Sequence, residues 1–451
     1  MKTNKIIALI LCLVLLVAFA AACNRDKDNN GDSSSDGQQS SDGEGNLPPL
    51  SDDPLDGTIE VWCWDPALSI YAMSEAARIY KDINPNFDIN IVEVSWNELQ
   101  TRLSTISSTG ALDELPDLFL MQDNAFRKNV TSYPELFVDI TGSDIDFSQF
   151  SEGKLSHSTI NGRNFGVPFD AGTVVNALRT DVLEEANLRL SDFTDVTWDR
   201  YIELGKQVLA ETGKAIYSDI HRDTDLLMIM LQSAGANLFN EDGSINIADN
   251  AELKQAIGIF VELVESGVCH MVDNRDDYIA SFVSGEVAGV INGCWVLGTI
   301  QGATGQSGDW GITNLPKMNT PGATNYSDYG GSSWVLTSSS RYKELSLDFL
   351  ENTFAGSVEF YEAILPSSGA VGAWLPAGRS AVYQEPHAFF GGQPIYANIA
   401  DFTSKVPSNN SGVYYFEARD AVGAALARIL DGADIDTELQ SAHNQVSSSM
   451  G

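Results

Sequence analysis

The spacing of apolar positions changes repeatedly between two periods along the chain. Thr58–Trp62 is a short β-rich run that predicts a buried strand, and residues 67–82 carry apolar side chains at helical spacing. Two further strands are expected at Ile89–Val94 and Leu118–Met121, with a helix over Trp96–Ser107 between them. Strands that alternate with helices favour a parallel, doubly wound α/β lobe.

A second set of elements follows Gly166-Val167-Pro168. Thr197 is placed to cap a helix that runs through Thr212, and Gly267 is placed to end a helix over Ala251–Ser266. The pattern also predicts strands at Val287–Ile291 and Trp334–Thr337, and helices over Arg341–Phe354 and Glu417–Leu430. A chain of 451 residues exceeds what one hydrophobic core usually spans, so two lobes are expected.

The first 23 residues have the pattern of an export signal. Lys2 and Lys5 precede an apolar run over Ile6–Phe19, and three alanines then precede Cys23. The apolar run is shorter than the roughly 20 residues that a membrane-spanning helix needs. A cysteine after small residues resembles a lipobox, which implies a signal peptide over 1–22 and lipidation of Cys23. The match departs from the family pattern at Ala20, where Leu is preferred.

Residues 23–54 are expected to form a flexible tether. They are rich in Asp, Asn, Ser and Gly and contain too few apolar side chains to build a core. We therefore expect the protein on the extracellular face of the cell membrane, held there by one lipidated end. The lipoprotein pattern implies a Gram-positive type of attachment.

Charge and motifs exclude several classes of function. The formal net charge is −36, from 26 Lys and Arg against 62 Asp and Glu, which opposes nucleic-acid or polyanion binding; solubility is its simplest role. No HExxH, GxSxG, P-loop or GxGxxG motif occurs, so we expect no cofactor, no metal and no enzymatic activity. With Cys12 in the leader and Cys23 lipidated, three cysteines are left, and a Cys269–Cys294 disulfide is one alternative.

Short motifs along most of the chain occur in a specific order. They are TIEVWCWD (58–65), YKDINPNFDINIVEVSWNEL (80–99), LPDLFLMQDN (115–124), INGRNFGVPFDAGT (160–173), FVSGEVAGVINGCW (282–295) and GGSSWVLTSSSRYKELSLDFLEN (330–352). Each is weak by itself. Their order and spacing resemble the sugar-binding family of ABC importer proteins, the group that includes maltodextrin-binding protein, over about 55–445.

This resemblance implies a two-lobed, periplasmic-binding-protein-like fold of type II. Each lobe would be a doubly wound α/β sheet flanked by helices, and crossover segments would join the lobes as a hinge. The expected N-terminal lobe covers 55–168 plus 309–338, and the expected C-terminal lobe covers 169–308 plus 339–446. The resemblance also implies a monomer that closes on a sugar or oligosaccharide and delivers it to the ABC permease subunits.

A sugar site needs flat aromatic rings for the C–H faces of the sugar and planar polar groups for its hydroxyls. Trp295 follows a strand and matches a tryptophan that stacks on sugar in the family. The other candidates stand at strand ends, crossovers and Gly-rich loops: Trp64, Asp65, Gln122, Asp123, Asn124, Asp170, Asp219, His221, Gly331, Trp334, Trp374, Arg379 and Tyr415.

Other interpretations stay open for these residues and for the function. Any of the tryptophans could instead pack in a core, as we expect for Trp62, Trp96, Trp198 and Trp310, and the polar residues could form turns. The ligand could be a polyamine, a peptide or a metal instead of a sugar. A secreted glycosidase would also carry aromatic rings and carboxylates, and a sensor accessory to a membrane receptor would bind ligand without transport.

Overall fold

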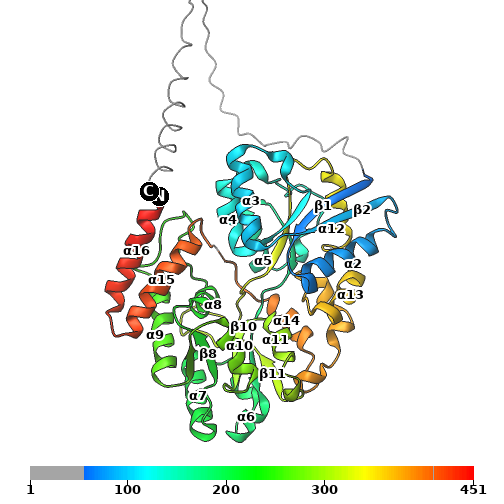
Figure 1. The fold of residues 1–451 in the computed structure, drawn as a ribbon. Coiled ribbons are helices and arrows are strands. Elements are labelled where there is room, and N and C mark those ends of the chain that lie inside the picture. Colours follow the sequence, from blue (N-terminus) through cyan, green and yellow to red (C-terminus); the bar gives the residue numbers. More distant parts are fainter. Residues whose placement is uncertain (1–54, 410) are drawn as a thin grey trace, which may run out of the picture. The chain divides into compact units, whose positions relative to one another are not determined.

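The computed structural model describes residues 55–409 and 411–451, which carry two main β-sheets with helices packed around them (Figure 1). The expected signal peptide over 1–22, Cys23 and the expected tether over 23–54 lie outside the described residues. Within the described part of the chain, no helix combines the length and the apolar character that crossing a membrane requires.

The first sheet has the strand order β2-β1-β3-β12-β6. Its strands are β1 (Gly57–Cys63), β2 (Phe87–Glu93), β3 (Leu118–Gln122), β6 (Val167–Asp170) and β12 (Ser332–Leu336). β1 pairs in parallel with β2 and β3, whereas β12 runs antiparallel to both of its neighbours. The sheet is therefore mixed. β12 reaches it from β11, a strand of the second sheet.

Helices follow the strands of this sheet. They are α2 (Tyr71–Tyr80), α3 (Trp96–Thr109), α4 (Phe126–Ser132), α5 (Glu152–Ser158), α12 (Lys343–Asn352) and α13 (Val358–Ser368). The helix expected over 67–82 begins as a separate π-helical turn at Pro66–Ile70 before α2. A short hairpin of β4 (Thr159–Ile160) and β5 (Arg163–Asn164) precedes β6.

The second sheet has the order β10-β7-β11, and a parallel pair β8-β9 accompanies it. The strands are β7 (Val174–Arg179), β8 (Tyr217–Ile220), β9 (Cys269–Val272), β10 (Gly289–Gly293) and β11 (Trp310–Thr313). The longer helices of this half and of the C-terminal part are α6 (Thr180–Glu185), α7 (Trp198–Thr212), α8 (Asp225–Ser233), α9 (Ala251–Glu265), α10 (Arg275–Val283), α11 (Val296–Gln301), α14 (Ile395–Thr403), α15 (Tyr415–Leu430) and α16 (Ile435–Met450).

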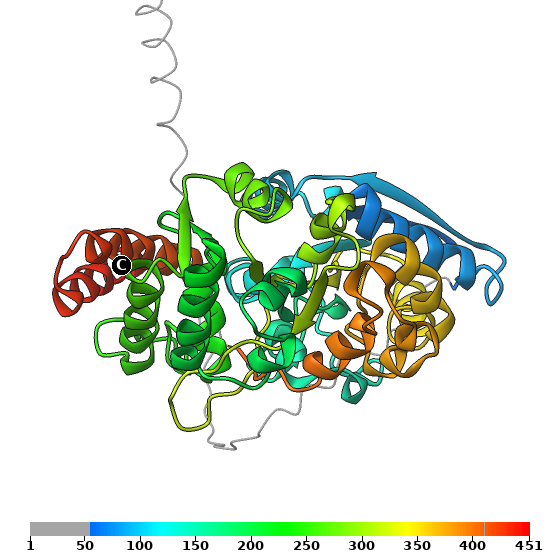
Figure 2. The same cartoon turned by 90° about the horizontal axis from the view of Figure 1, so that it is seen from below.

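Both views place α15 and α16 side by side at the end of the molecule opposite α2 and β2 (Figures 1 and 2). The two-lobed α/β fold class is confirmed. The residue boundaries of the lobes stay a prediction, although β11 pairs with β7 in the second sheet and α13 packs against α2 beside the first.

The local signals explain why these elements begin and end where they do. The Arg200 backbone N–H donates to Thr197 Oγ1 at 3.4 Å, so Thr197 caps α7 as expected. Gly267 has φ +73 just after α9, a conformation that glycine adopts without the steric cost of a Cβ. α16 was not expected, because a run of polar residues hides the narrow apolar stripe of Leu439, Ala442 and Val446.

Three connections run between the sheets and meet near one another. The first joins β6 to β7, the second joins β11 to β12, and the third follows α14. Thr173 forms a β-bridge with Asp328, and its hydroxyl lies 2.6 Å from that of Thr403. One hydrophobic cluster contains residues of both sheets, including Val61 and Val175. The crossovers therefore pack directly against this hydrophobic core.

Candidate functional site

A cavity of about 400 Å³ lies beside the crossovers. Asp65, Asp170 and Trp295, predicted from three separate segments, all line it. Their neighbours are largely apolar or aromatic: Ala67, Leu68, Ala171, Cys294, Leu297, Gly298, Gln301, Pro366, Gly369, Ala370, Val371, His387, Tyr396 and Ile399. A cavity of this size with a few polar groups among apolar ones is typical of a small-molecule site.

Trp295 presents an exposed aromatic ring at this cavity. It follows the strand β10 and is 36% exposed, although most large apolar side chains of the described residues are buried. Its indole Nε1–H donates to the Tyr329 carbonyl at 3.2 Å, and the Arg275 guanidinium lies 5.2 Å from its ring centroid. The hydrogen bond fixes the ring in place, which makes it suited to stacking on a flat ligand face.

Asp65 holds an unusual backbone conformation at the edge of the cavity. Its φ is +62, and its Oδ1 accepts from the N–H groups of Ala67 and Leu68 at 3.0 and 3.2 Å. A non-glycine residue in this region stores strain of the kind that collects at functional sites. Trp64, next to it, packs edge-on against Trp96 at 5.5 Å and is not among the residues that line the cavity.

A second polar group surrounds Arg419 on α15. Arg419 forms a close ion pair with Asp225 and a longer one, 3.5 Å, with Asp223. The Tyr329 hydroxyl also donates to Asp225, and the rings of Tyr329 and Tyr415 lie 5.9 and 5.7 Å from the guanidinium. Because the Tyr329 backbone carbonyl accepts the indole N–H of Trp295, the Arg419 cluster is continuous with the Trp295 side chain.

Two buried carboxyl groups, Asp225 in the Arg419 cluster and Asp219 nearby, have raised pKa values. Burial and the neighbouring Asp223 raise the pKa of Asp225 to about 7, against the opposing charge of Arg419. Burial also raises the pKa of Asp219, whose carboxylate accepts from the Tyr217 hydroxyl. Asp219 shares a small cavity of about 20 Å³ with Asp225 and Arg275. His221 is exposed and lines an open groove beside Arg419.

A third group of charges lies buried between β3, α5 and the crossovers. Lys154 pairs closely with Asp123 and donates to the Ser332 carbonyl at 3.0 Å. Ser333 donates to the other oxygen of Asp123 at 3.0 Å, and the Ser332 backbone N–H donates to Asp170 at 2.9 Å. Desolvation raises the pKa of both carboxyls, while Lys154 opposes the shift.

Gly331 leaves room for these buried charges. Its φ is +86, and a Cβ atom there would lie 2.7 Å from Asp123 Oδ2 and 2.9 Å from Lys154 Nζ. Gln122, at the end of β3, pairs with Ser332 in the β-ladder. Asn124 lies beside the Tyr415 hydroxyl, and Tyr415 itself is buried in the Arg419 cluster.

Three of the candidates lie away from these groups. Trp334 is fully buried between Phe169 and Phe354, at ring distances of 5.8 and 5.4 Å, so it is a core residue. Trp374 is 8% exposed and stacks on Tyr361 at 6.1 Å, which makes it the anchor of its loop. Arg379 is exposed at the end of the turn Leu375–Arg379 and does not line the cavity.

The expectations for other residues had mixed outcomes. Trp62, Trp198 and Trp310 are buried as expected. The Cys269–Cys294 disulfide is absent, because both thiols are free: Cys269 contacts the Met271 sulfur at 3.7 Å and Cys294 donates to the Ala171 carbonyl at 3.2 Å.

Sequence reasoning missed several residues of these groups. They are Lys154, Asp223, Asp225, Arg275, Asp328, Tyr329 and Arg419. The acidic run after β8 and the Asp-Tyr-Gly-Gly segment before β12 were visible signals. The pairing of Arg419 with Asp225, 194 positions away, was not visible, because no local pattern records it.

Comparison with known proteins identifies the family of the chain. The family model for bacterial extracellular solute-binding proteins matches residues 75–390. The lactose-binding protein of Rhizobium radiobacter is 39% identical over 389 residues, which cover 86% of this chain and 92% of that protein. The arabinooligosaccharide-binding protein of Halalkalibacterium halodurans is 24% identical over 80% of this chain and 82% of its own length.

Solved structures share the fold at lower identity. The sugar-binding protein MalE of Xanthomonas citri superposes with a TM-score of 0.73 at 17% identity and covers 87% of this chain and 97% of its own. The galacto-N-biose-/lacto-N-biose I-binding protein of the Bifidobacterium longum ABC transporter gives 0.68 at 18% identity, over 88% of this chain and 98% of its own. The chain therefore belongs to the bacterial extracellular solute-binding protein family.

Proposed function

We propose that the protein binds a neutral disaccharide or short oligosaccharide against Trp295 and delivers it to an ABC importer. The observation that carries this proposal is the exposed, hydrogen-bonded Trp295 ring at the wall of a 400 Å³ cavity beside the crossovers. Burial of one sugar face on the indole removes apolar surface from water, which favours binding in proportion to the area covered.

Polar groups for the sugar hydroxyls stand on both sides of Trp295. Asp65 and Asp170 line the cavity, and Arg275, Asp225 and Arg419 stand on the side of the Arg419 cluster. Charged groups that are shielded from water form strong hydrogen bonds to hydroxyls, and their mutual pairing keeps them oriented before the ligand arrives. The two sides can be tested separately by mutation, because Gln301 lines the cavity and Arg419 does not.

Lactose is the first ligand to test. A protein 39% identical over most of the chain is described as lactose-binding, and two more distant relatives as arabinooligosaccharide-binding. We propose that the sugar is released unchanged, since the relatives are binding proteins. We also propose attachment through Cys23, a monomeric state and delivery to permease subunits, on the basis of the N-terminal pattern and the family.

The test is a calorimetric titration with lactose, arabino-oligosaccharides, maltose and spermidine. Trp295→Ala should weaken binding of the preferred sugar by about 30-fold or more, the loss expected when an aromatic centre worth roughly 2 kcal/mol is removed. Trp295→Phe keeps an aromatic face and should retain most of the affinity. Preference for spermidine, or an unchanged affinity in Trp295→Ala, would overturn the proposal, and hydrolysed sugar after long incubation would indicate a glycosidase.

A further inference from the structure

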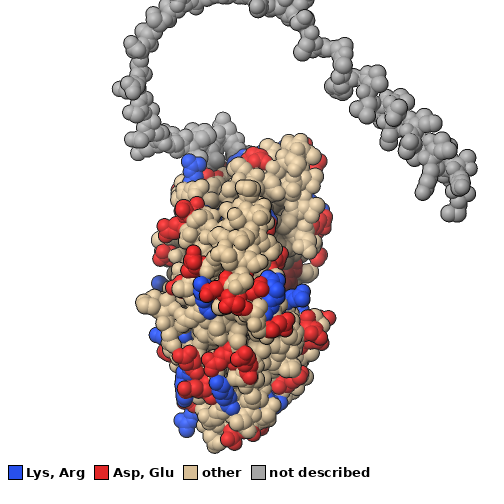
Figure 3. Space-filling model, turned by 90° about the vertical axis from the view of Figure 1, so that its left-hand side faces the viewer, with Lys and Arg blue, Asp and Glu red and all other residues tan. Residues whose placement is uncertain are grey.

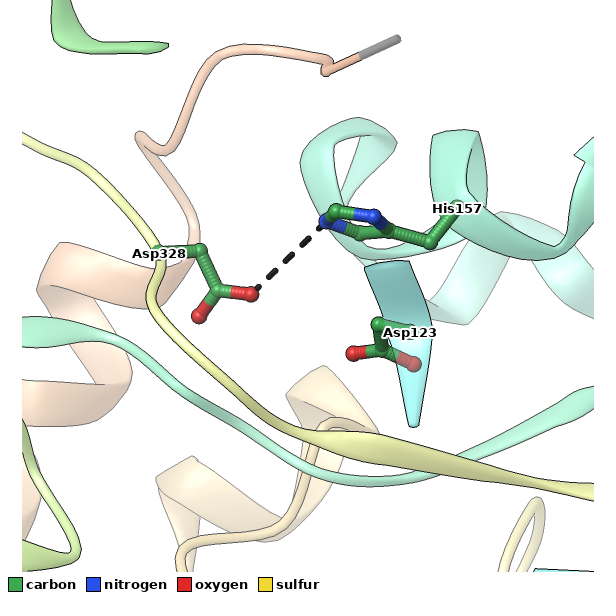
Figure 4. A group of neighbouring side chains, drawn as sticks. All are labelled: Asp123, His157 and Asp328. Atoms are coloured by element: carbon green, nitrogen blue, oxygen red, sulfur yellow. Dashed lines mark ion pairs between the residues drawn. The ribbon is translucent and has the colours of Figure 1, made fainter. Parts of the chain in front are cut away.

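The side chains of Asp123, His157 and Asp328 converge in the interior beside the crossovers (Figure 4). One potential ligand atom from each lies within 4.8 Å of the other two. They come from three segments: Asp123 from the turn directly after β3, His157 from α5, and Asp328 from the connection between β11 and β12. We propose that these three side chains form a binding site for one divalent transition-metal ion such as Zn²⁺.

His157 carries the argument. The residue is only 8% exposed, and among residues 55–409 and 411–451 neither of its ring nitrogens has a hydrogen-bond partner. A buried polar group without a partner costs free energy, so such groups in native proteins usually serve a ligand or a function. Its Nε2 points toward Asp328 and lies 3.9 Å from Oδ2, a separation that a metal ion between the two atoms can bridge (Figure 4).

The ionisable groups around His157 have a negative net charge when all of them are ionised. Asp123, Asp170 and Asp328 contribute three carboxyl groups, and Lys154 is the cation that acts on all three in the part of the chain that the structure describes. With every carboxyl ionised, the sum is −2, so a dication would bring the cluster to neutrality.

The chemistry of the ligands points to a transition metal. Within the described part of the chain, no hydrogen bond occupies Nδ1 or Nε2 of His157, so either nitrogen is open to a metal ion. An imidazole nitrogen with carboxylate oxygens suits Zn²⁺ better than Ca²⁺, which prefers six or more oxygen ligands. Asp123 would have to share its oxygens between the metal and its partners Lys154 and Ser333.

The location gives the ion a structural consequence. Asp328 lies on a crossover, whereas Asp123 and His157 belong to elements around the first sheet. A metal bound by all three would cross-link the crossover to that half of the molecule. We therefore expect Zn²⁺ to raise the thermal unfolding temperature, because binding to the native state alone stabilises it.

The experiment uses tag-free protein stripped with EDTA and dialysed free of chelator. Calorimetric titration with Zn²⁺ should give one tight site in the wild type, and Co²⁺ should give a d–d absorption spectrum at the same stoichiometry. His157→Gln and Asp328→Asn should each abolish this site and the thermal shift. His270→Gln is the matched control, because His270 forms an exposed pair with Glu286 at 3.3 Å.

Each result decides the proposal. The same Zn²⁺ stoichiometry and affinity in wild type and in both variants would show binding elsewhere on the surface and overturn it. Absence of tight binding to the wild type would overturn it as well, as would tighter binding of Ca²⁺ than of Zn²⁺. If His157→Gln does not fold, Asp328→Asn alone decides, since Asn keeps the shape of the side chain. Sugar titrations of the same samples keep this result separate from the proposed transport function.

Discussion

Replacement of Lys154 by Met should strongly destabilise the protein. The side chains of Lys154 and Asp123 are 3% and 1% exposed, and Lys154 also donates to the Ser332 carbonyl. Met fills a similar volume but leaves Asp123 and Asp170 without their cation. Loss of one partner of a buried ion pair costs about 3–5 kcal/mol, a large part of the 5–15 kcal/mol that stabilises a typical domain.

The matched control is Lys81→Met. Lys81 pairs with Asp88 at 2.9 Å, but the two side chains are 46% and 62% exposed, and an exposed pair contributes only about 0–1 kcal/mol. Urea unfolding followed by tryptophan fluorescence gives the free energy of unfolding of both variants. The double variant Lys154→Met with Asp123→Leu should recover part of the loss, because it removes the stranded charge as well. A loss in Lys154→Met as small as that in Lys81→Met would refute the reasoning.

Three further predictions follow from single residues. Asp225 has a pKa of about 7 in the folded protein and an ordinary value in the unfolded chain, so between these values the folded state binds more protons. The free energy of unfolding should therefore fall as the pH rises from about 4 through 7. Asp225→Asn should flatten this pH dependence in urea midpoints measured across the range. Gly331→Ala should cost about 1–3 kcal/mol of stability, since the new Cβ would lie 2.7 Å from Asp123 Oδ2 and the backbone φ of residue 331 is +86. An unchanged melting temperature would contradict this prediction. Trp334→Ala should cost about 3–5 kcal/mol, as a large core truncation does, while the sugar affinity of the folded protein stays the same; a selective loss of affinity would return Trp334 to the site.

Much of the architecture could be predicted from local pattern. The strands at 58–62 and 118–121 and the capped helix after Thr197 follow from periodicity and capping residues, which act within a few positions. The antiparallel entry of β12 beside β3 could not be predicted this way, because strand direction depends on where the chain returns from the other sheet.

The site was only partly predictable for the same reason. Trp295 and Asp65 stand at strand ends, where side chains of α/β sheets face ligands, and Trp295 also matches a family motif; both line the cavity. Trp334 was a candidate because its segment resembles a crossover of the family, but every residue of its strand β12 is buried, which the local pattern does not record. The overall charge also says little about the site, since acidic and basic side chains are both spread over the face of the molecule that Figure 3 shows.

The most direct test is a crystal structure of the protein grown with the sugar that binds most tightly in the titrations. We expect one sugar ring to lie flat on the Trp295 indole beside the crossovers, with its hydroxyls hydrogen-bonded to Asp or Arg side chains that border this ring. A sugar bound elsewhere on the surface, with Trp295 still facing solvent, would contradict the proposed function.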